Sequence, residues 1–253
     1  MRRAGVTIAL ALAAAGCAGH PHGAVATGPP PATSTLCGAL PAGLHTTPLW
    51  LRTSDGVRLY AAVAGSGTTA VVLAHQSPAN LCGWLPTMRY LSSHGIATLA
   101  FNFRTFAPSG SPRPTISRHL APDLQAAIDA ARARGARRVF VMGASFGGAA
   151  TLAYGAQLRD LAGVINLSGE LRLLNWNLDG IDAVRRLKAP LLVVASRYDG
   201  YLDAADARLL YRRAGSTKKR LVIFPGGFHG WAILDEAPYA ARARALILAW
   251  LRE

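Results

Sequence analysis

The segment most informative about the fold is Val139-Phe140-Val141-Met142-Gly143-Ala144-Ser145-Phe146-Gly147-Gly148. Its first four residues are apolar, as in a strand covered on both faces, and a helix is expected from Gly147 onward. Glycines at 143 and 147 leave room for a sharp turn that holds Ser145 in a strained backbone at its tip. We therefore expect Ser145 to be a nucleophile with an exposed Oγ; the alternative is a tight glycine turn with an idle serine.

Apolar runs and helical stretches alternate on either side of this segment. A half-buried strand is expected at 57–63, and continuous apolar runs predict buried strands at 70–74, 97–101, 139–142, 163–167, 191–194 and 221–224. Helices are expected at 84–93, 119–134, 147–158, 181–187, 203–213 and 239–252. This alternation predicts the α/β class, with a doubly wound, mostly parallel sheet in one domain that spans residues 49–253.

Two candidate partners for the serine follow later strands. A serine hydroxyl is a poor nucleophile, so it needs a base that is oriented by a carboxylate. Asp199 lies just beyond one apolar run and His229 just beyond the next, at the strand ends where open parallel sheets bind ligands. The 30 residues between them amount to one helix and one strand, so their loops are expected side by side. Asp203 and Asp206 are alternative acids, but they fall where a helix starts, and Asp203 fits its N-cap better.

The order Ser145, Asp199, His229 is that of the α/β-hydrolase family, which residues 49–253 resemble. The His229-Gly230-Trp231 ending is most similar to small esterase-like and dienelactone-hydrolase-like members. The resemblance implies a Ser–Asp–His hydrolase with no metal and no organic cofactor. Ser145 argues against dienelactone hydrolase activity itself, which uses a cysteine. It also argues against dehalogenase and epoxide hydrolase reactions, which use an aspartate.

A tetrahedral intermediate needs two amide donors for its oxyanion. One is expected from the backbone N–H of Phe146, directly after the nucleophile. The other is expected from the backbone N–H of Gln76, which replaces the glycine of the family's His-Gly pattern. The neighbouring His75 is expected to brace this loop rather than to act in catalysis.

Two segments bear on the shape of the pocket. Asn102-Phe103-Arg104-Thr105 stands where many family members carry Asp-x-Arg-Gly after the fourth strand, so the support of that loop differs. About 20 residues separate Ser168 from Pro190, where the family often inserts a lid, so no full cap domain fits. The apolar residues there either form a small flap over the pocket or pack against the sheet: Leu171, Leu173, Leu174, Trp176 and Leu178. An open pocket suits short-chain or aryl esters better than long triglycerides.

These residues predict a carboxylesterase that forms an acyl-enzyme on Ser145 with small-molecule esters. A peptidase or amidase on the same residues is one alternative, although the chain has no propeller or large cap of the kind such peptidases often carry. A non-catalytic envelope-binding protein on a hydrolase fold is another, and the set of Ser145, Asp199 and His229 argues against it.

The charge of the chain raises other partners. Lys and Arg number 27 against 13 Asp and Glu, and the net charge of +14 suits nucleic acid or an acidic membrane. No recognition motif accompanies the basic residues, so no nucleic-acid partner is expected. The hydrophobic fraction of 51% excludes a disordered chain, and the 26 glycines have no period, which excludes collagen.

The N-terminus predicts export. Met1-Arg2-Arg3 is basic, and the uncharged run at 4–16 spans about 20 Å as a helix, short of the roughly 30 Å of a bilayer core. Residues 1–16 are therefore expected to be an export signal. Ala14-Ala15-Gly16-Cys17 resembles the lipobox of bacterial lipoproteins, although that family prefers leucine at the position of Ala14. The resemblance implies a diacylated Cys17 and anchoring on the outside of the cell membrane; the alternative is cleavage nearby, for example after Ala18, and secretion.

A Pro/Gly/Thr-rich segment at 17–48 is expected to be an extended, solvated tether between anchor and domain. Its His20-Pro21-His22 pair lacks carboxylate or thiol support, so linker is favoured over a metal site. With Cys17 lipidated, Cys37 and Cys82 remain as an even pair in an oxidising compartment. A disulfide between them is favoured over two buried thiols.

Overall fold

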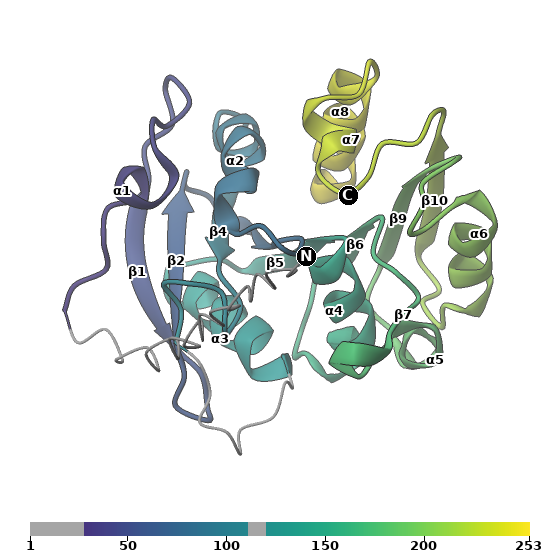
Figure 1. The fold of residues 1–253 in the computed structure, drawn as a ribbon, viewed down its shortest axis with the longest axis horizontal. Helices are drawn as coiled ribbons and strands as arrows, with labels where there is room; N and C mark the ends of the chain where they lie inside the picture. The colour runs from purple at the N-terminus through teal and green to yellow at the C-terminus, as the bar shows by residue number, and fades with distance from the viewer. Residues whose placement is uncertain (1–27, 111–119) are drawn as a thin grey trace, which may run out of the picture.

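A computed structural model describes residues 28–110 and 120–253, and its centre is an eight-stranded sheet in the order β1-β2-β4-β3-β5-β6-β9-β10 (Figure 1). The first two pairs, β1 with β2 and β2 with β4, are antiparallel, and all later pairs are parallel. The strands are β1 Thr47–Arg52, β2 Arg58–Ala64, β3 Thr69–Ala74, β4 Ala97–Phe101, β5 Arg138–Ala144, β6 Gly163–Leu167, β9 Leu191–Ser196 and β10 Lys219–Phe224. The predicted doubly wound, mostly parallel sheet is confirmed.

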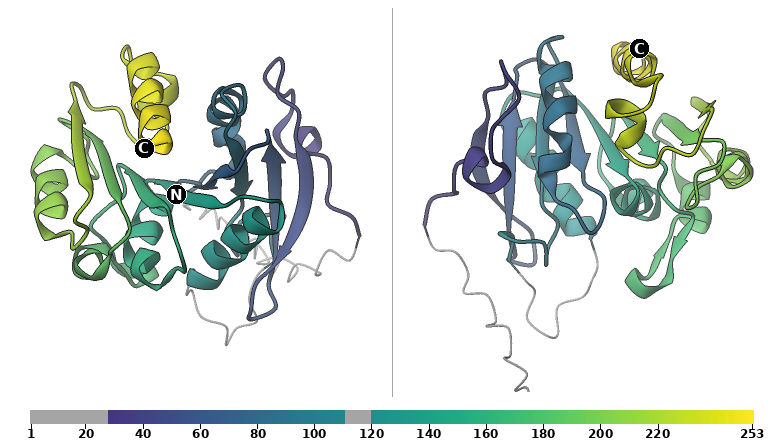
Figure 2. Two further views of the ribbon diagram at one scale, coloured as in Figure 1. Left: turned by 180° about the vertical axis from the view of Figure 1, so that it is seen from behind. Right: turned by 45° about the horizontal axis from the view of Figure 1, so that its top comes forward.

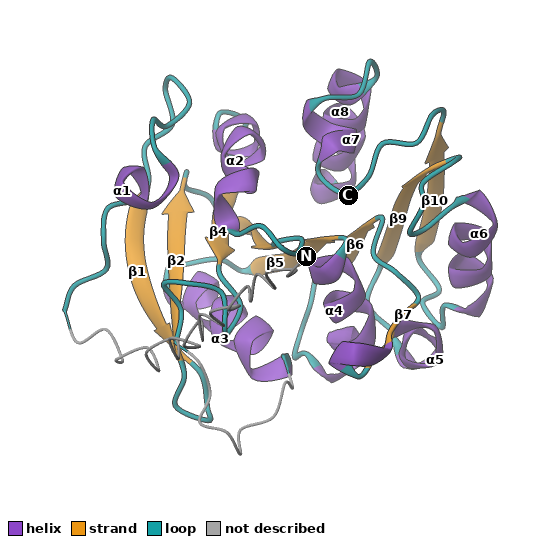
Figure 3. Cartoon of the chain, viewed as in Figure 1, coloured by secondary structure: helices purple, strands orange, loops and turns teal. Residues whose placement is uncertain are grey.

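Helices cover both faces of this sheet, as Figure 2 shows from two further sides. α2, α7 and α8 pack on one face, and α3, α4, α5 and α6 pack on the other. The helices are α1 Thr33–Cys37, α2 Leu85–Ser92, α3 Ala121–Ala133, α4 Phe146–Tyr154, α5 Gly180–Ala183, α6 Ala204–Arg213, α7 Ala232–Asp235 and α8 Ala240–Arg252. In Figure 3 the orange strands accordingly lie between two purple layers.

The central strand β5 shows why its sequence is apolar without alternation. Successive side chains of a strand point to opposite faces, and both faces are covered here. Phe140 and Met142 pack on the α2 and α8 side, whereas Val139 and Val141 pack on the α3 and α4 side. Each such side chain contributes about 1.5–3 kcal/mol to stability when it is fully buried, so the side chains on both faces of the strand stabilise the fold.

Most predicted elements are present, with shifted ends. The helix expected at 147–158 begins at Phe146, ends at Tyr154 and continues as a 3-10 turn, Gly155–Gln157. The helix expected at 181–187 is α5 followed by a second 3-10 turn, Val184–Arg186. Further 3-10 turns are Leu81–Trp84 and Leu174–Trp176. The sequence did not predict β1, α1, α7 or the small antiparallel hairpin of β7 (Arg172–Leu173) and β8 (Leu178–Asp179).

The segment before β1 differs from the extended, solvated tether expected at 17–48. Its described part packs on the domain: the Trp50 indole N–H donates to the Gly28 carbonyl at 2.9 Å, and the Tyr60 hydroxyl donates to the Pro31 carbonyl at 2.9 Å. Thr33 is buried at the start of α1. Large aromatic side chains on β1 and β2 therefore bind the Pro-rich segment to the domain, although its composition alone predicts an extended, solvated chain.

A disulfide joins Cys37, at the end of α1, to Cys82, in the turn before α2, with their Cα atoms 5.4 Å apart. The predicted pairing is confirmed. The bond ties the segment before β1 to the α2 face of the sheet and closes a loop of 45 residues.

The predicted export signal, the lipidated Cys17 and the His20-Pro21-His22 pair lie outside the described residues. Within 28–110 and 120–253, no helix has both the length and the hydropathy that crossing a bilayer requires.

Candidate active site

Ser145 occupies the sharp turn between β5 and α4, with φ 49° and ψ −114°. This positive φ is unfavourable for a residue with a side chain, and it is held by close packing on both sides. A Cβ on Gly147 would lie 2.2 Å from the carbonyl oxygen of Ala74, and one on Gly143 would lie 2.2 Å from that of Gly147. Only glycine fits either position, so the two glycines around Ser145 are required by the turn itself.

Asp199 and His229 meet beside this turn, as their adjacent strands β9 and β10 predict. The His229 Nδ1 atom lies 2.9 Å and 3.0 Å from the two carboxylate oxygens of Asp199. The Asp199 side chain is fully buried, and the His229 side chain is 23% exposed. Burial alone raises the pKa of Asp199, but hydrogen bonds from the His229 ring and the Tyr201 backbone N–H outweigh it, so its pKa is lowered. An ionised Asp199 places the ring proton on Nδ1 and leaves Nε2 free to accept one.

Asp203, the alternative acid, lies elsewhere. Its carboxylate accepts the backbone N–H groups of Ala205 and Asp206 and caps α6, as the sequence predicts. Asp206 follows in the first turn of that helix.

Ser145 and His229 line one cavity of about 370 Å³ at the carboxyl edge of the sheet. The described residues form no hydrogen bond between Ser145 Oγ and His229 Nε2, and a long contact in a ligand-free structure does not exclude a nucleophile and its base. The cavity is lined by Gln76, Ser77, Ser145, Phe146, Glu170, Leu173, Asn175, Trp176, Tyr201 and His229.

The two predicted oxyanion donors, Phe146 and Gln76, both line this cavity. Phe146 is the first residue of α4, so its N–H has no acceptor within the helix. The N–H of Gln76 has no backbone acceptor in the described chain. The side chain of Gln76 has a second role that the sequence did not reveal, because its Oε1 accepts the N–H of Trp231 at 3.4 Å and braces the loop that carries His229.

His75 is the structural histidine that the sequence predicts. Its ring is fully buried, its Nε2 accepts the N–H of Phe103 at 3.1 Å, and its Nδ1 lies 2.9 Å from the carbonyl of Gln76. Burial lowers its pKa to about 4, which keeps the ring neutral. It therefore fixes the loop that presents the Gln76 N–H.

The segment that departs from the family's Asp-x-Arg-Gly is supported differently. The Asn102 side chain accepts the N–H of Leu81 at 2.8 Å and donates to the carbonyl of Ala107 at 2.7 Å. Thr105 takes the glycine's place with a φ of 72°. Arg104 is fully buried and pairs with Asp55 and Asp123. Side-chain hydrogen bonds and a buried ion pair thus hold the loop.

The predicted apolar flap is the β7–β8 hairpin. Leu173 and Trp176 line the cavity, and the Trp176 ring centroid lies 4.8 Å from that of Phe146. Leu178 is buried in the core on the α3 and α4 side, and Leu174 is 82% exposed at the tip. The hairpin therefore closes one side of the cavity but does not cover it.

Glu170 is a cavity residue that sequence reasoning missed. It follows the carboxyl end of β6 as Asp199 follows that of β9, which is the signal that could have identified it. Burial raises its pKa, the charge of Asp199 adds to this, and His229 opposes it.

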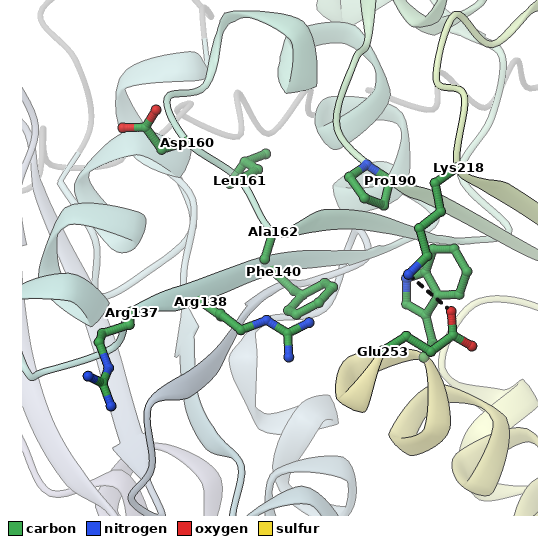
Figure 4. A pocket seen from close by; sticks show the side chains of 10 residues that line it. Arg137, Arg138, Phe140, Asp160, Leu161, Ala162, Pro190, Lys218 and Glu253 are labelled. Carbon is green, nitrogen blue, oxygen red and sulfur yellow. Dashed lines mark ion pairs between the residues drawn. The ribbon is translucent and has the colours of Figure 1, made fainter.

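A second cavity lies at the opposite edge of the sheet, where β5 and β10 begin (Figure 4). Arg137, Arg138 and Lys218 line it, and Lys218 pairs with Glu253 at 3.2 Å. No Ser, Cys or His is among its lining residues, so it has no counterpart of the Ser145 and His229 side chains. The described residues also contain no group of three or more His, Cys, Asp or Glu that could hold a metal ion.

Residues 71–251 match the sequence profile of the Alpha/beta hydrolase family. The chain matches no curated protein. An esterase from Pyrococcus furiosus has a similar structure, with 16% identity and a TM-score of 0.73 over 88% of this chain and 97% of that chain. A monoacylglycerol lipase from Paleococcus ferrophilus has 18% identity and a TM-score of 0.65 over 76% of this chain and 98% of that chain. An esterase from Exiguobacterium antarcticum has 15% identity and a TM-score of 0.66 over 81% and 99%.

Proposed function

Because the chain belongs to the Alpha/beta hydrolase family, we propose that it is a serine hydrolase that cleaves carboxylic esters through an acyl-enzyme on Ser145. One observation carries the proposal: a His229 ring held by the buried Asp199 carboxylate lines the same cavity as a serine on a strained turn. The esterase and lipase structures of the same fold are consistent with this chemistry.

In the proposed reaction, Ser145 Oγ attacks the ester carbonyl carbon while His229 Nε2 takes the hydroxyl proton. The backbone N–H groups of Phe146 and Gln76 stabilise the oxyanion that forms. The intermediate then expels the alkoxide, which takes the proton from His229 and leaves as the alcohol. Water attacks the acyl-enzyme with His229 as base again, and the acid leaves as Ser145 regains its proton. Asp199 holds the ring in one tautomer throughout.

The cavity supports small esters as substrates. Its volume of about 370 Å³ is at the lower end for ligand pockets, and the apolar walls come from Phe146, Leu173 and Trp176. Short-chain and aryl esters fit these walls, and a long triglyceride does not.

We infer that the protein is exported and anchored to the outer side of the cell membrane by a lipid on Cys17, with secretion as the alternative. The Cys37–Cys82 disulfide supports an oxidising compartment. Mass spectrometry of the membrane fraction tests this: a diacylated N-terminal Cys17 supports the anchor, and a chain that begins after Ala18 in the medium contradicts it.

Hydrolysis of p-nitrophenyl acetate tests the proposed chemistry. The wild-type protein should turn the ester over, Ser145→Ala should not, and Ser93→Ala, on the exposed end of α2, should match the wild type. Equal turnover by wild type and Ser145→Ala would overturn the assignment. Faster cleavage of p-nitroacetanilide than of the ester would favour the amidase alternative.

A further inference from the structure

The cavity beside Ser145 contains a carboxylate that the proposed reaction does not use. Glu170 lines it, is half-buried, and takes part in none of the ion pairs that the described residues form. The nearest arginine along the chain, Arg172, is engaged instead with Asp179 at 3.0 Å and Asp182 at 3.7 Å. A partly desolvated carboxylate without a cation is unfavourable, and a cationic ligand relieves that cost.

The backbone that carries Glu170 is fixed. The buried side chain of Asn166 accepts the N–H of Gly169 at 3.0 Å and contacts its carbonyl at 3.5 Å. A Cβ on Gly148 would lie 2.6 Å from the Cα of Gly169, so the loop after β6 packs directly on the first turn of α4. Glu170 is therefore held next to the turn that carries Ser145.

The other walls of the cavity suit a cation as well. Phe146, Trp176 and Tyr201 line it, and the Tyr201 ring centroid lies 4.4 Å from that of His229. The negative faces of aromatic rings attract organic cations, and do so more strongly when water is excluded. Glu170 is the one Asp, Glu, Lys or Arg among the described lining residues, in a protein whose net charge is +14.

These contacts select the kind of cation. Calcium and magnesium need several oxygen ligands, whereas a single carboxylate beside aromatic rings fits an alkylated ammonium. We propose that Glu170 and the aromatic walls make this site selective for esters that carry an organic ammonium group in the acyl or the alcohol part. This inference rests on the proposed ester hydrolysis at Ser145 and specifies its substrate class.

Matched pairs of esters test the proposal, because each pair differs only in charge. Butyrylcholine is compared with 3,3-dimethylbutyl butyrate for the alcohol part. Ethyl 4-(trimethylammonio)butyrate is compared with ethyl 5,5-dimethylhexanoate for the acyl part. At pH 8, the wild type should show a kcat/KM at least about fivefold higher for the cationic member of one pair.

The variant Glu170→Gln should lower that cationic-to-neutral ratio about fivefold to tenfold. Glu236→Gln, on the exposed surface between α7 and α8, removes the same charge outside the cavity and should leave the ratio unchanged. Because the readout is a ratio, a general loss of activity in Glu170→Gln does not affect it. A wild type that prefers the neutral esters, or an unchanged ratio in Glu170→Gln, overturns the proposal.

Binding separates failure of this proposal from failure of the ester chemistry. Ser145→Ala is titrated with butyrylcholine by calorimetry, and Ser145→Ala/Glu170→Gln is titrated in parallel. A dissociation constant about fivefold to tenfold higher for the double variant supports cation recognition even if the wild type hydrolyses no ester. Equal dissociation constants overturn it even if hydrolysis at Ser145 is established.

Discussion

The ring of His229 and the carboxylate of Asp199 contact each other through both carboxylate oxygens, at 2.9 Å and 3.0 Å from Nδ1. The two residues lie 30 positions apart and meet because β9 and β10 are parallel neighbours whose carboxyl ends share one edge. The fold thus places a buried anion against a partly exposed imidazole, which is the arrangement that the proposed general base requires. The opposite edge of the sheet has a cavity of similar size but no such pair.

Asp199→Asn should lower kcat for p-nitrophenyl acetate about 10³-fold to 10⁴-fold with little change in KM. Asparagine keeps the shape but favours the wrong ring tautomer and cannot stabilise a protonated ring. Asp203→Asn serves as the control, since asparagine also caps a helix, and its kcat should stay within about twofold of the wild type. A large loss of kcat in Asp203→Asn with none in Asp199→Asn would show that Asp199 is not the acid.

Sequence patterns sufficed for the parts of the fold with strong local signals. The run 139–142 followed by the glycines around Ser145 predicted strand, turn and helix. The pattern is informative because only glycine fits where the backbone of the turn passes so close to Ala74. The meeting of Asp199 and His229 followed from their places after strands β9 and β10. The Cys37–Cys82 pairing followed from an even count once Cys17 was set aside.

Features that depend on distant contacts were not predictable. β1 and α1 form because Trp50 and Tyr60 hold the Pro-rich segment, which has no periodicity of its own. The bracing of the His229 loop joins the side chain of Gln76 to a residue 155 positions away. Glu170 carries no motif, and its place in the cavity becomes visible only when the loop after β6 is placed against α4.

The buried His75 should make stability depend on pH. Its pKa is about 4 in the folded protein and 6.5 when exposed, so the unfolded chain takes up a proton first as the pH falls. The contribution of neutral His75 to the free energy of unfolding is complete above pH 6.5 and is lost as the pH falls towards 4. Between pH 7 and 5 the wild type should lose about 2 kcal/mol of unfolding free energy through this group.

Urea unfolding of His75→Gln checks the pH effect, because the variant should lack this loss even if it is less stable at pH 7. His94→Gln, at the exposed end of α2, should retain the wild-type dependence. Identical pH dependence in His75→Gln and the wild type would show that His75 is not the group responsible.

Asp123 should be important for stability. Its carboxylate is fully buried and contacts the equally buried Arg104 guanidinium at 2.6 Å. Asp123→Ala leaves the buried Arg104 guanidinium with only the Asp55 carboxylate as a counter-charge among the described residues. The variant should therefore lower the free energy of unfolding by about 3–5 kcal/mol, as measured in urea. Asp129→Ala, on the exposed face of the same helix, removes a surface ion pair with Arg159 and should cost less than about 1 kcal/mol. Equal costs would mean that burial does not determine the effect.

The Cys37–Cys82 disulfide should stabilise the domain by restricting its unfolded chain. Replacing both cysteines with serine opens a loop of 45 residues and should lower the unfolding free energy by about 2–4 kcal/mol. Reduction of the wild type should produce a similar loss and should have no effect on the double variant. Equal stability of the oxidised wild type and the double variant would contradict this role.

The proposed ester hydrolysis depends above all on Ser145 as the nucleophile, and the most direct test is peptide mass spectrometry after treatment with a fluorophosphonate. We expect one adduct, on the peptide that contains Ser145, in the wild type. We expect none in Ser145→Ala, and strongly reduced labelling in His229→Ala because the serine then lacks its base. An unlabelled wild-type protein, or an adduct on another residue that persists in Ser145→Ala, would contradict the account.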